Sequence, residues 1–496
     1  MSNLIDSEVT EEITIDVVKS RSVKGIVLLT GRTFVLSAIS LFATGLLTVF
    51  LDPSQFGVFW IVSAIVNFFA YFSDIGLAAS LIQKKEKPND EDLKTTFTIQ
   101  QLLVLLILIG MFIGMPIFQR IYGLSMEGKY LLYALGISLV FSSLKTIPSV
   151  LLERELEFSK LVIPQVIETL VYSLVAVFFA WKGLGLRSFT YAVLVRGFVG
   201  LVLIYLYKPW MPGLYFSKKS FKKLLSYGLP YQANTLLAVL KDDAMIAFLG
   251  TILGASGMGF LGWAQRWGYA PLRFFMDHIV KVTFPAFARM QDKKQDLKHS
   301  LTRSIFFICF LVFPTLIGLL IVAPILVRVI PRYEKWLPAV IPLTFIGINT
   351  FFAATTTQLT NLLNSIGKIK VTFKLMIMWT VLTWVLVPIL AIKYGVNGAA
   401  FGYSVVGFSS IIAIFIARQY VRFSLIDSAF KPALSAIVMG ILLYLLRGYL
   451  PQNMKSVIIL IVIGIVIYLS LSFVLIGQSL VTDIKKSVST LLGKDN

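Results

Sequence analysis

The stretch QRWGYAPLRFFMDHIVKVTFPAFARMQD, residues 265–292, combines two properties that seldom occur together. Most of its side chains are apolar, yet Arg266, Arg273, Asp277 and Lys281 interrupt it at spacings of 7, 4 and 4. These spacings are close to multiples of a helical turn, so the sequence predicts one helix with its charges on one face. Because a charged stripe is strongly unfavourable against lipid, we expect this face to contact other helices or water.

The whole chain has the composition of a polytopic membrane protein. Of its 496 residues, 57% are hydrophobic and 14% are charged, and its mean hydropathy is +0.84. Many apolar runs reach about 20 residues, the length that crosses the hydrocarbon core as a helix. We therefore predict an all-α membrane protein with about fourteen spans, at residues 23–50, 55–82, 95–119, 128–150, 159–181, 188–207, 222–251, 256–287, 304–330, 337–363, 371–392, 397–418, 430–447 and 456–481.

The net charge of +20 is distributed as in a membrane protein rather than a nucleic-acid-binding protein. In the connections and span ends, 28 of the 45 Lys and Arg residues lie on the side of the termini and 10 on the other side. Since positive residues stay cytoplasmic, we predict that both termini are cytoplasmic. We also expect no cleavable signal peptide. The single cysteine, Cys309, leaves no internal disulfide.

Two pairs of similar segments indicate an internal duplication. LDPSQFG (51–57) and LGASGMG (253–259) both read L-x-x-S-x-x-G and are 202 residues apart. KGLGLRSFTYA (182–192) and YGVNGAAFGYS (394–404) form a second pair at an offset of about 210 residues. We expect two parallel six-helix lobes with a cleft between them that opens to either face. The predicted units are a cytoplasmic N-terminal segment 1–22, an N-lobe 23–208, a cytoplasmic inter-lobe loop 209–221, a C-lobe 222–422, two added helices 423–482 and a cytoplasmic tail 483–496.

Charged residues inside the predicted spans are the candidate functional residues. A charge at bilayer depth costs at least about 2.5 kcal/mol on insertion scales, so each one requires a reason. We take the cations as candidate ligands of an anionic substrate, and the acids as candidates for ion coupling or charge pairing. The cations are Arg32, Arg196, Lys241, Arg266, Arg273 and Lys281, and the acids are Asp74, Glu168, Asp242, Asp243 and Asp277.

Two interpretations of the quoted stretch remain open. Arg273, Asp277 and Lys281 form either an ion-pair ladder that fixes neighbouring helices or one wall of a cationic cavity.

Membrane depth, estimated from the helical rise per residue, predicts which of the charges inside the spans meet. The expected pairs are Arg32 with Asp74, Arg196 with Glu168, and Arg266 with Asp242 and Asp243.

Uncharged polar and aromatic residues add candidate sugar contacts, namely Asn234, Trp263 and Trp267. Packing and membrane-interface roles are the alternative for such aromatics. The sequence contains no GxxxxGKS loop, GxSxG elbow, HExxH pair or paired-cysteine pattern. ATP hydrolysis and acyl hydrolysis therefore lack their usual residues, and we expect neither an enzyme, nor a cofactor, nor a metal site.

Three segments resemble a known family. FSDIGLAASLIQKKE (72–86), ERELEFSK (153–160) and especially VTFPAFARMQD (282–292) are similar to segments of bacterial polysaccharide-unit flippases. The closest similarity is to the Wzx-type, colanic-acid-exporter-like branch of the multidrug/oligosaccharidyl-lipid/polysaccharide exporter superfamily. The resemblance covers at least residues 25–420, and Asp74 and residues 284–292 are its family marks.

The resemblance implies a V-shaped helical fold around a central cavity in the bacterial inner membrane. It implies a flippase that moves an undecaprenyl-diphosphate-linked oligosaccharide from the inner to the outer leaflet, for O-antigen, capsule or exopolysaccharide assembly. The expected partners are this lipid-linked oligosaccharide, membrane lipids, and the polymerase and chain-length machinery, with no nucleic acid. Membrane potential and coupling to H⁺ or Na⁺ both remain as drives.

Three alternatives remain at this point. A multidrug or cation antiporter of the same superfamily usually favours acidic residues for cationic drugs, whereas cations slightly exceed acids here. A membrane glycosyltransferase or polymerase needs an acidic catalytic site, commonly near a sizeable outer loop, and the predicted outer loops are short. A flippase for the peptidoglycan precursor shares the lipid carrier, and only a substrate assay separates it.

Overall fold

The computed structural model describes the backbone of residues 15–477, and every regular element in that range is helical, as predicted. The side chains of residues 15–30, 230, 231, 233–235, 277 and 278 lie outside the described part. In chain order the elements are α1 (Ile15–Phe50), α2 (Pro53–Ala70), η1 (Tyr71–Ser73), α3 (Leu77–Gln83), α4 (Asp90–Tyr122), α5 (Met126–Leu144), α6 (Thr146–Arg154), α7 (Phe158–Trp181), α8 (Arg187–Tyr207), α9 (Lys218–Val239), η2 (Leu240–Ala244), α10 (Met245–Gly268), α11 (Ala270–Arg289), α12 (Lys294–Val329), η3 (Glu334–Ala339), α13 (Val340–Ser365), α14 (Ile369–Phe408), α15 (Ser410–Tyr420), η4 (Ile426–Phe430), α16 (Lys431–Arg447) and α17 (Met454–Ile476).

Twelve helical stretches of the described chain are long and apolar enough to cross a membrane. Two of them, Leu236–Met276 and Ile369–Tyr420, are 41 and 52 residues long, more than one crossing needs. Each contains a glycine with non-helical backbone, Gly254 (φ 64°, ψ −177°) and Gly395 (φ 59°, ψ −140°). Positive φ is accessible to glycine at little cost, so at each of these glycines the chain turns tightly from one helix into the next. These turns coincide with two predicted connections, and the count of fourteen spans stays a prediction.

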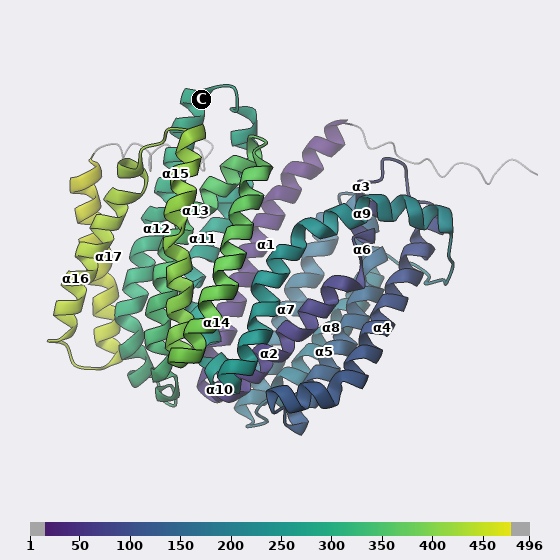
Figure 1. The fold of residues 1–496 in the computed structure, drawn as a ribbon, viewed down its shortest axis with the longest axis horizontal. Coiled ribbons are helices and arrows are strands. Elements are labelled where there is room, and N and C mark those ends of the chain that lie inside the picture. The colour runs from purple at the N-terminus through teal and green to yellow at the C-terminus, as the bar shows by residue number, and fades with distance from the viewer. Residues whose placement is uncertain (1–14, 478–496) are drawn as a thin grey trace, which may run out of the picture.

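The helices form two groups (Figure 1). Helix α1 packs on α7, so α1 to α8, purple to blue, make up one group, which we call the first half; α10 to α15, teal to green, make up the second half. Helices α16 and α17 pack against α12 at the far edge of the second half. Helix α1 begins and α17 ends at the same end of the bundle, which we call the terminal end.

The two L-x-x-S-x-x-G segments meet where α2 packs along α10. A Cβ atom on Gly57 would lie 1.6 Å from the carbonyl oxygen of Ala255, and one on Gly259 would lie 1.8 Å from that of Pro53. The two contacts are equivalent, because Pro53 corresponds to Ala255 and Gly57 to Gly259 at the offset of 202 residues. The repeated glycines therefore let the backbones of the two halves touch.

Further contacts join the halves at the end opposite the termini. The indole nitrogen of Trp336 donates to the carbonyl oxygen of Thr48 at 2.7 Å. Lys335 Nζ donates to the carbonyl oxygen of Val49 at 3.1 Å and contacts an Asp52 carboxylate oxygen at 3.3 Å. Element η3 of the second half thus packs on the α1–α2 connection of the first.

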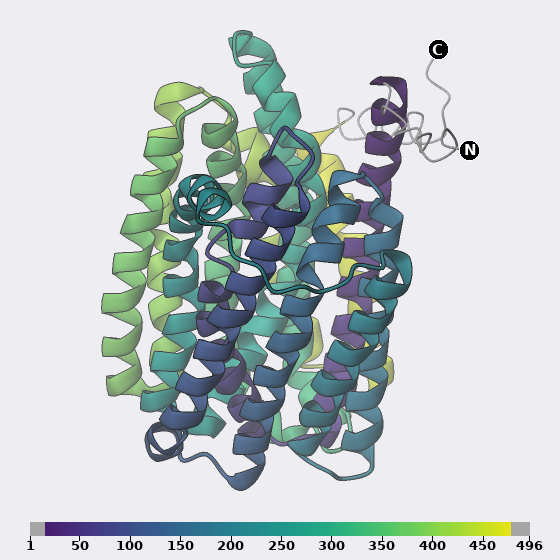
Figure 2. The same ribbon diagram turned by 90° about the vertical axis from the view of Figure 1, so that its right-hand side faces the viewer.

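Helix α9 links the halves near the terminal end. The chain leaving α8 crosses the face of the first half before α9 begins (Figure 2). Helix α9 packs on α3, where a Cβ on Gly76 would lie 2.2 Å from the carbonyl oxygen of Gly228 and Ser80 Oγ donates to that of Leu224 at 2.7 Å. The predicted boundary at residue 222 therefore falls inside a helix that contacts the first half.

Candidate functional site

The quoted stretch is not one helix. Helix α10 ends at Gly268, and α11 begins at Ala270 with Pro271 in its first turn. Proline is well tolerated there because the first amides of a helix have no intrahelical acceptor. The expectation of one continuous stripe is therefore wrong: Arg266 belongs to α10, and Arg273 and Lys281 belong to α11.

The first half contains a buried carboxylate with two cations. Glu168, on α7, has only 8% of its side chain exposed, and Lys145 Nζ donates to its Oε1 at 2.7 Å. Arg196, on α8, places Nε 3.6 Å from Glu168 Oε2 while 49% of its side chain stays exposed. The predicted pair of Arg196 with Glu168 is confirmed. Lys145 was not among the candidates, although it lies inside the predicted span 128–150.

Tyr172 lies beside this group. It lies one helical turn beyond Glu168 on α7, and the guanidinium carbon of Arg196 is 5.8 Å from its ring centre. Tyr172 was not among the site residues predicted from the sequence.

Asp242 and Asp243, both in η2, have partners other than Arg266. Asp242 has 63% of its side chain exposed and pairs with its neighbour Lys241. Asp243 instead accepts a hydrogen bond from the amide of Asn67 on α2 at 3.5 Å. Neither acid takes Arg266 as its ion-pair partner in the described structure, so that predicted pairing is wrong.

Arg32 and Asp74 also have other partners than each other in the described structure. Arg32 Nη1 donates to Gln165 Oε1 on α7 at 2.6 Å. Asp74 accepts from Gln100 Nε2 at 2.8 Å and from the backbone nitrogen of Ala78 at 3.2 Å, in the first turn of α3. Asp74 therefore caps a helix, because its carboxylate satisfies an otherwise unpaired amide. The predicted Arg32–Asp74 pair is wrong.

Lys281 joins α11 to α1, and the ladder of Arg273, Asp277 and Lys281 stays a prediction. Its Nζ donates to Thr33 Oγ1 on α1 at 3.1 Å. On the same pair of helices, the rings of Phe34 and Phe274 lie 4.7 Å apart. Lys281 and Arg273 are both exposed side chains of α11. The side chain of Asp277 lies outside the described part.

The three residues predicted as sugar contacts lie in different environments. Trp263 is only 5% exposed, its Nε1 donates to the Tyr333 hydroxyl at 3.3 Å, and it stacks on Trp336 at 5.9 Å. It therefore packs in the core, and its prediction as a sugar contact is wrong. Trp267 is partly buried, with its ring near Gly45 of α1. The side chain of Asn234 lies outside the described part.

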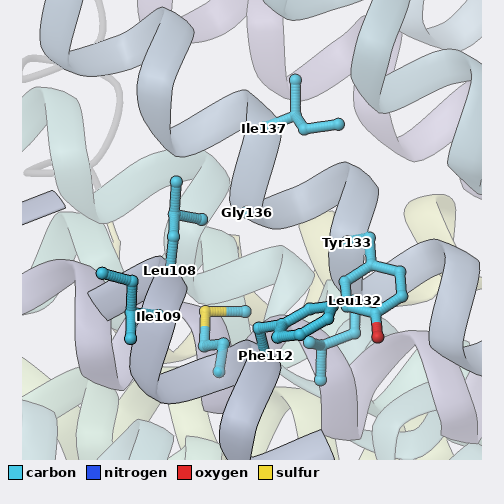
Figure 3. Close-up of a pocket in the computed structure, with 8 residues that line it drawn as sticks. Leu108, Ile109, Phe112, Leu132, Tyr133, Gly136 and Ile137 are labelled. Atoms are coloured by element: carbon cyan, nitrogen blue, oxygen red, sulfur yellow. The ribbon is translucent and has the colours of Figure 1, made fainter. Parts of the chain in front are cut away.

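A pocket of about 440 Å³ lies elsewhere, between α4 and α5 (Figure 3). Its lining is apolar, and Phe112, Ile109 and Ile137 in it are exposed. Because exposed apolar side chains on a membrane-spanning helix face lipid, this pocket is a groove for hydrocarbon and not for a charged group. The described residues contain no group of three His, Cys, Asp or Glu side chains that could hold a metal ion.

A protein-family model with the description "Polysaccharide biosynthesis protein" matches residues 46–341. The chain belongs to this family. The matched range is more than half of the chain. It includes every candidate cation except Arg32.

Two relatives share sequence with this chain, and one solved structure shares its fold. Lipopolysaccharide biosynthesis protein WzxC of Escherichia coli (strain K12) is 24% identical over 393 residues, which cover 77% of this chain and 78% of WzxC. Succinoglycan biosynthesis transport protein ExoT of Rhizobium meliloti (strain 1021) is 22% identical over 54% of each chain. The solved structure of lipid II flippase MurJ in an inward closed conformation has a TM-score of 0.71 at 16% identity and covers 92% of this chain and 98% of MurJ. This last likeness shows the fold.

Proposed function

We propose that this polysaccharide biosynthesis protein moves an undecaprenyl-diphosphate-linked oligosaccharide unit from the inner to the outer leaflet of the bacterial cytoplasmic membrane. The unit would serve O-antigen, capsule or exopolysaccharide assembly. The observation that carries the proposal is Arg196, an exposed cation beside a buried carboxylate within a membrane-spanning helix, in a chain whose relatives are named for lipopolysaccharide biosynthesis and for succinoglycan transport.

The diphosphate is the part of this cargo that the arginines suit. Guanidinium groups present paired donors that match phosphate oxygens. Arg196 from the first half and Arg266 and Arg273 from the second would hold the diphosphate between the halves. The isoprenoid tail would remain in lipid, because only the polar head needs shelter from hydrocarbon.

Transport would proceed by alternating access of the two lobes, residues 23–208 and 222–422, around a central cavity. The contacts between the halves at the two ends of the bundle support this proposal, since each set can part while the other remains. With both termini cytoplasmic, the contacts of α9 with α3 would guard the inner face, and those of α2 with α10 the outer face.

The membrane potential is one drive that suits this movement. An anion that leaves a negative interior gains about 2.3 kcal/mol per charge per 100 mV. Coupling to H⁺ or Na⁺ through Asp74, Glu168 or Asp277 is the alternative drive. In the structure Asp74 is held by a helix amide and Gln100, and Glu168 by Lys145. The polymerase and chain-length machinery would act on the delivered unit and are proposed as partners.

The test is a leaflet-resolved transport assay on purified protein in vesicles that carry a short-chain lipid-linked oligosaccharide. We expect protein-dependent movement of the sugar to the opposite leaflet, faster when the potential drives the anion that way. Vesicles containing Arg273→Gln protein serve as the control. Movement no faster than in protein-free vesicles would overturn the proposal. Drug resistance conferred by the same protein would instead support the antiporter alternative.

A further inference from the structure

Lys145 lies outside the proposed cargo contacts yet makes the closest ion pair of the first half's buried cluster. It occupies the junction between α5 and α6, and 17% of its side chain is exposed. Its Nζ–Oε1 distance to Glu168, 2.7 Å, is that of a charge-assisted hydrogen bond. Arg196, at 3.6 Å, is beyond that range. Glu168 is thus hydrogen-bonded by Lys145 and only electrostatically attracted to Arg196.

The packing of α7 against α8 fixes the position of the Glu168 carboxylate. A Cβ on Gly200 of α8 would lie 1.8 Å from Glu168 Oε1, so this glycine leaves the space that the carboxylate occupies. Arg196 lies one helical turn before Gly200 on the same helix. The packing of α7 on α8 therefore keeps the carboxylate beside Arg196 whether or not Lys145 is present.

Arg196 has a second neighbour, because its guanidinium carbon lies 5.8 Å from the ring centre of Tyr172. One carboxylate and two cations give the cluster a surplus positive charge. Without Lys145 the cluster would be neutral, and Glu168 would become a bidentate partner for the Arg196 guanidinium.

We infer that Lys145 is a positioning residue: by serving as the counter-ion of Glu168, it keeps the guanidinium of Arg196 available to the phosphate group of an anionic lipid. This inference rests on the proposed function, since it concerns how the same site binds its cargo. Lys145 itself need not touch the cargo. Its effect passes through the charge of Glu168 and the orientation of Arg196.

The experiment measures binding of a short-chain isoprenyl diphosphate to purified protein, with the matching isoprenyl alcohol as the uncharged comparison. We expect Lys145→Met to weaken diphosphate binding about tenfold, because Arg196 turns to the unpaired carboxylate. The double variant Lys145→Met/Glu168→Gln removes that competitor, and we expect its affinity to return to within about threefold of the unsubstituted protein. Lys145→Arg keeps the cation and should bind like the unsubstituted protein.

Lys160→Met is the matched control, because Lys160 is a more exposed lysine that pairs with Glu157 at the start of α7. It should leave binding unchanged. Unchanged binding by Lys145→Met, or no recovery in the double variant, would overturn the inference. If Lys145→Met yields no folded protein, weak binding by the folded double variant overturns it as well. Absence of diphosphate binding by the unsubstituted protein would instead contradict the proposed function.

Discussion

At the residue scale, a charge inside an apolar span indicates a polar environment but not which one. Asp74 and Trp263 have ordinary structural roles, as a helix cap and a core side chain. Arg196 and Arg273 instead keep exposed side chains within membrane-spanning stretches. A cation that is embedded in a membrane-spanning stretch and still exposed is suited to bind an anion, because charges attract more strongly where the surroundings are less polar than water.

The accessible arginine of α11 gives the first residue-scale prediction. Arg273→Gln removes a charged hydrogen-bond donor, which contributes about 2 kcal/mol, or about thirtyfold in affinity. We expect surface polysaccharide to fall strongly in cells that depend on this chain, with unchanged protein levels in the membrane. Arg328→Gln is the control, since Arg328 lies in the last turn of α12, where its Nη1 donates to Gln452 Oε1 at 3.4 Å. Equal polysaccharide from both variants would exclude Arg273 as an essential contact.

At the element scale, the contact of α2 with α10 explains why the repeated motif ends in glycine. Gly57 and Gly259 occupy equivalent positions, and each is pressed against a backbone carbonyl of the opposite motif. Side chains larger than hydrogen would force the two helices apart. The motif is therefore a requirement of the contact between the halves as well as of the turns that it borders.

This contact predicts that Gly259→Ala destabilises the folded protein. Its Cβ would lie 1.8 Å from the Pro53 carbonyl oxygen, and overpacking of this kind costs about 1–3 kcal/mol. Gly110→Ala is the matched control, because nothing lies within 4 Å of a Cβ there and alanine favours a helix over glycine by about 1 kcal/mol. Thermal unfolding in detergent should show a lower midpoint for Gly259→Ala alone. Equal midpoints would mean that α2 and α10 do not touch in this way.

At the scale of the whole molecule, transport requires the halves to separate at one end at a time. Helix α1 of the first half meets α11 of the second through the pairs Phe34–Phe274 and Thr33–Lys281. If access alternates, they must open in part of the transport cycle.

A covalent link between α1 and α11 is therefore expected to stop transport. Cysteines placed at Phe34 and Phe274, in a chain whose buried Cys309 is replaced by serine, would be joined by a reducible cross-linker. We expect transport in vesicles to fall to background and to recover on reduction. A link between Gln101 and Ser143, which contact each other at 3.1 Å between α4 and α5 of the first half, should have no effect. Full transport by the α1–α11 cross-linked protein would exclude separation at this contact.

The sequence by itself determined the class of the protein, its helical spans, the duplication signal and its family resemblance. These follow from local properties: apolar run length, charge asymmetry and motif spacing are written along the chain. Only the tertiary structure decided the partners of the embedded charges. Depth along a helix indicated that Arg196 and Glu168 could meet, but it could not exclude Arg32 with Asp74, because depth says nothing of the direction in which a side chain points around the bundle. Lys145 and Tyr172 could not be predicted for the same reason, since their contacts arise from the packing of α5, α7 and α8 against one another.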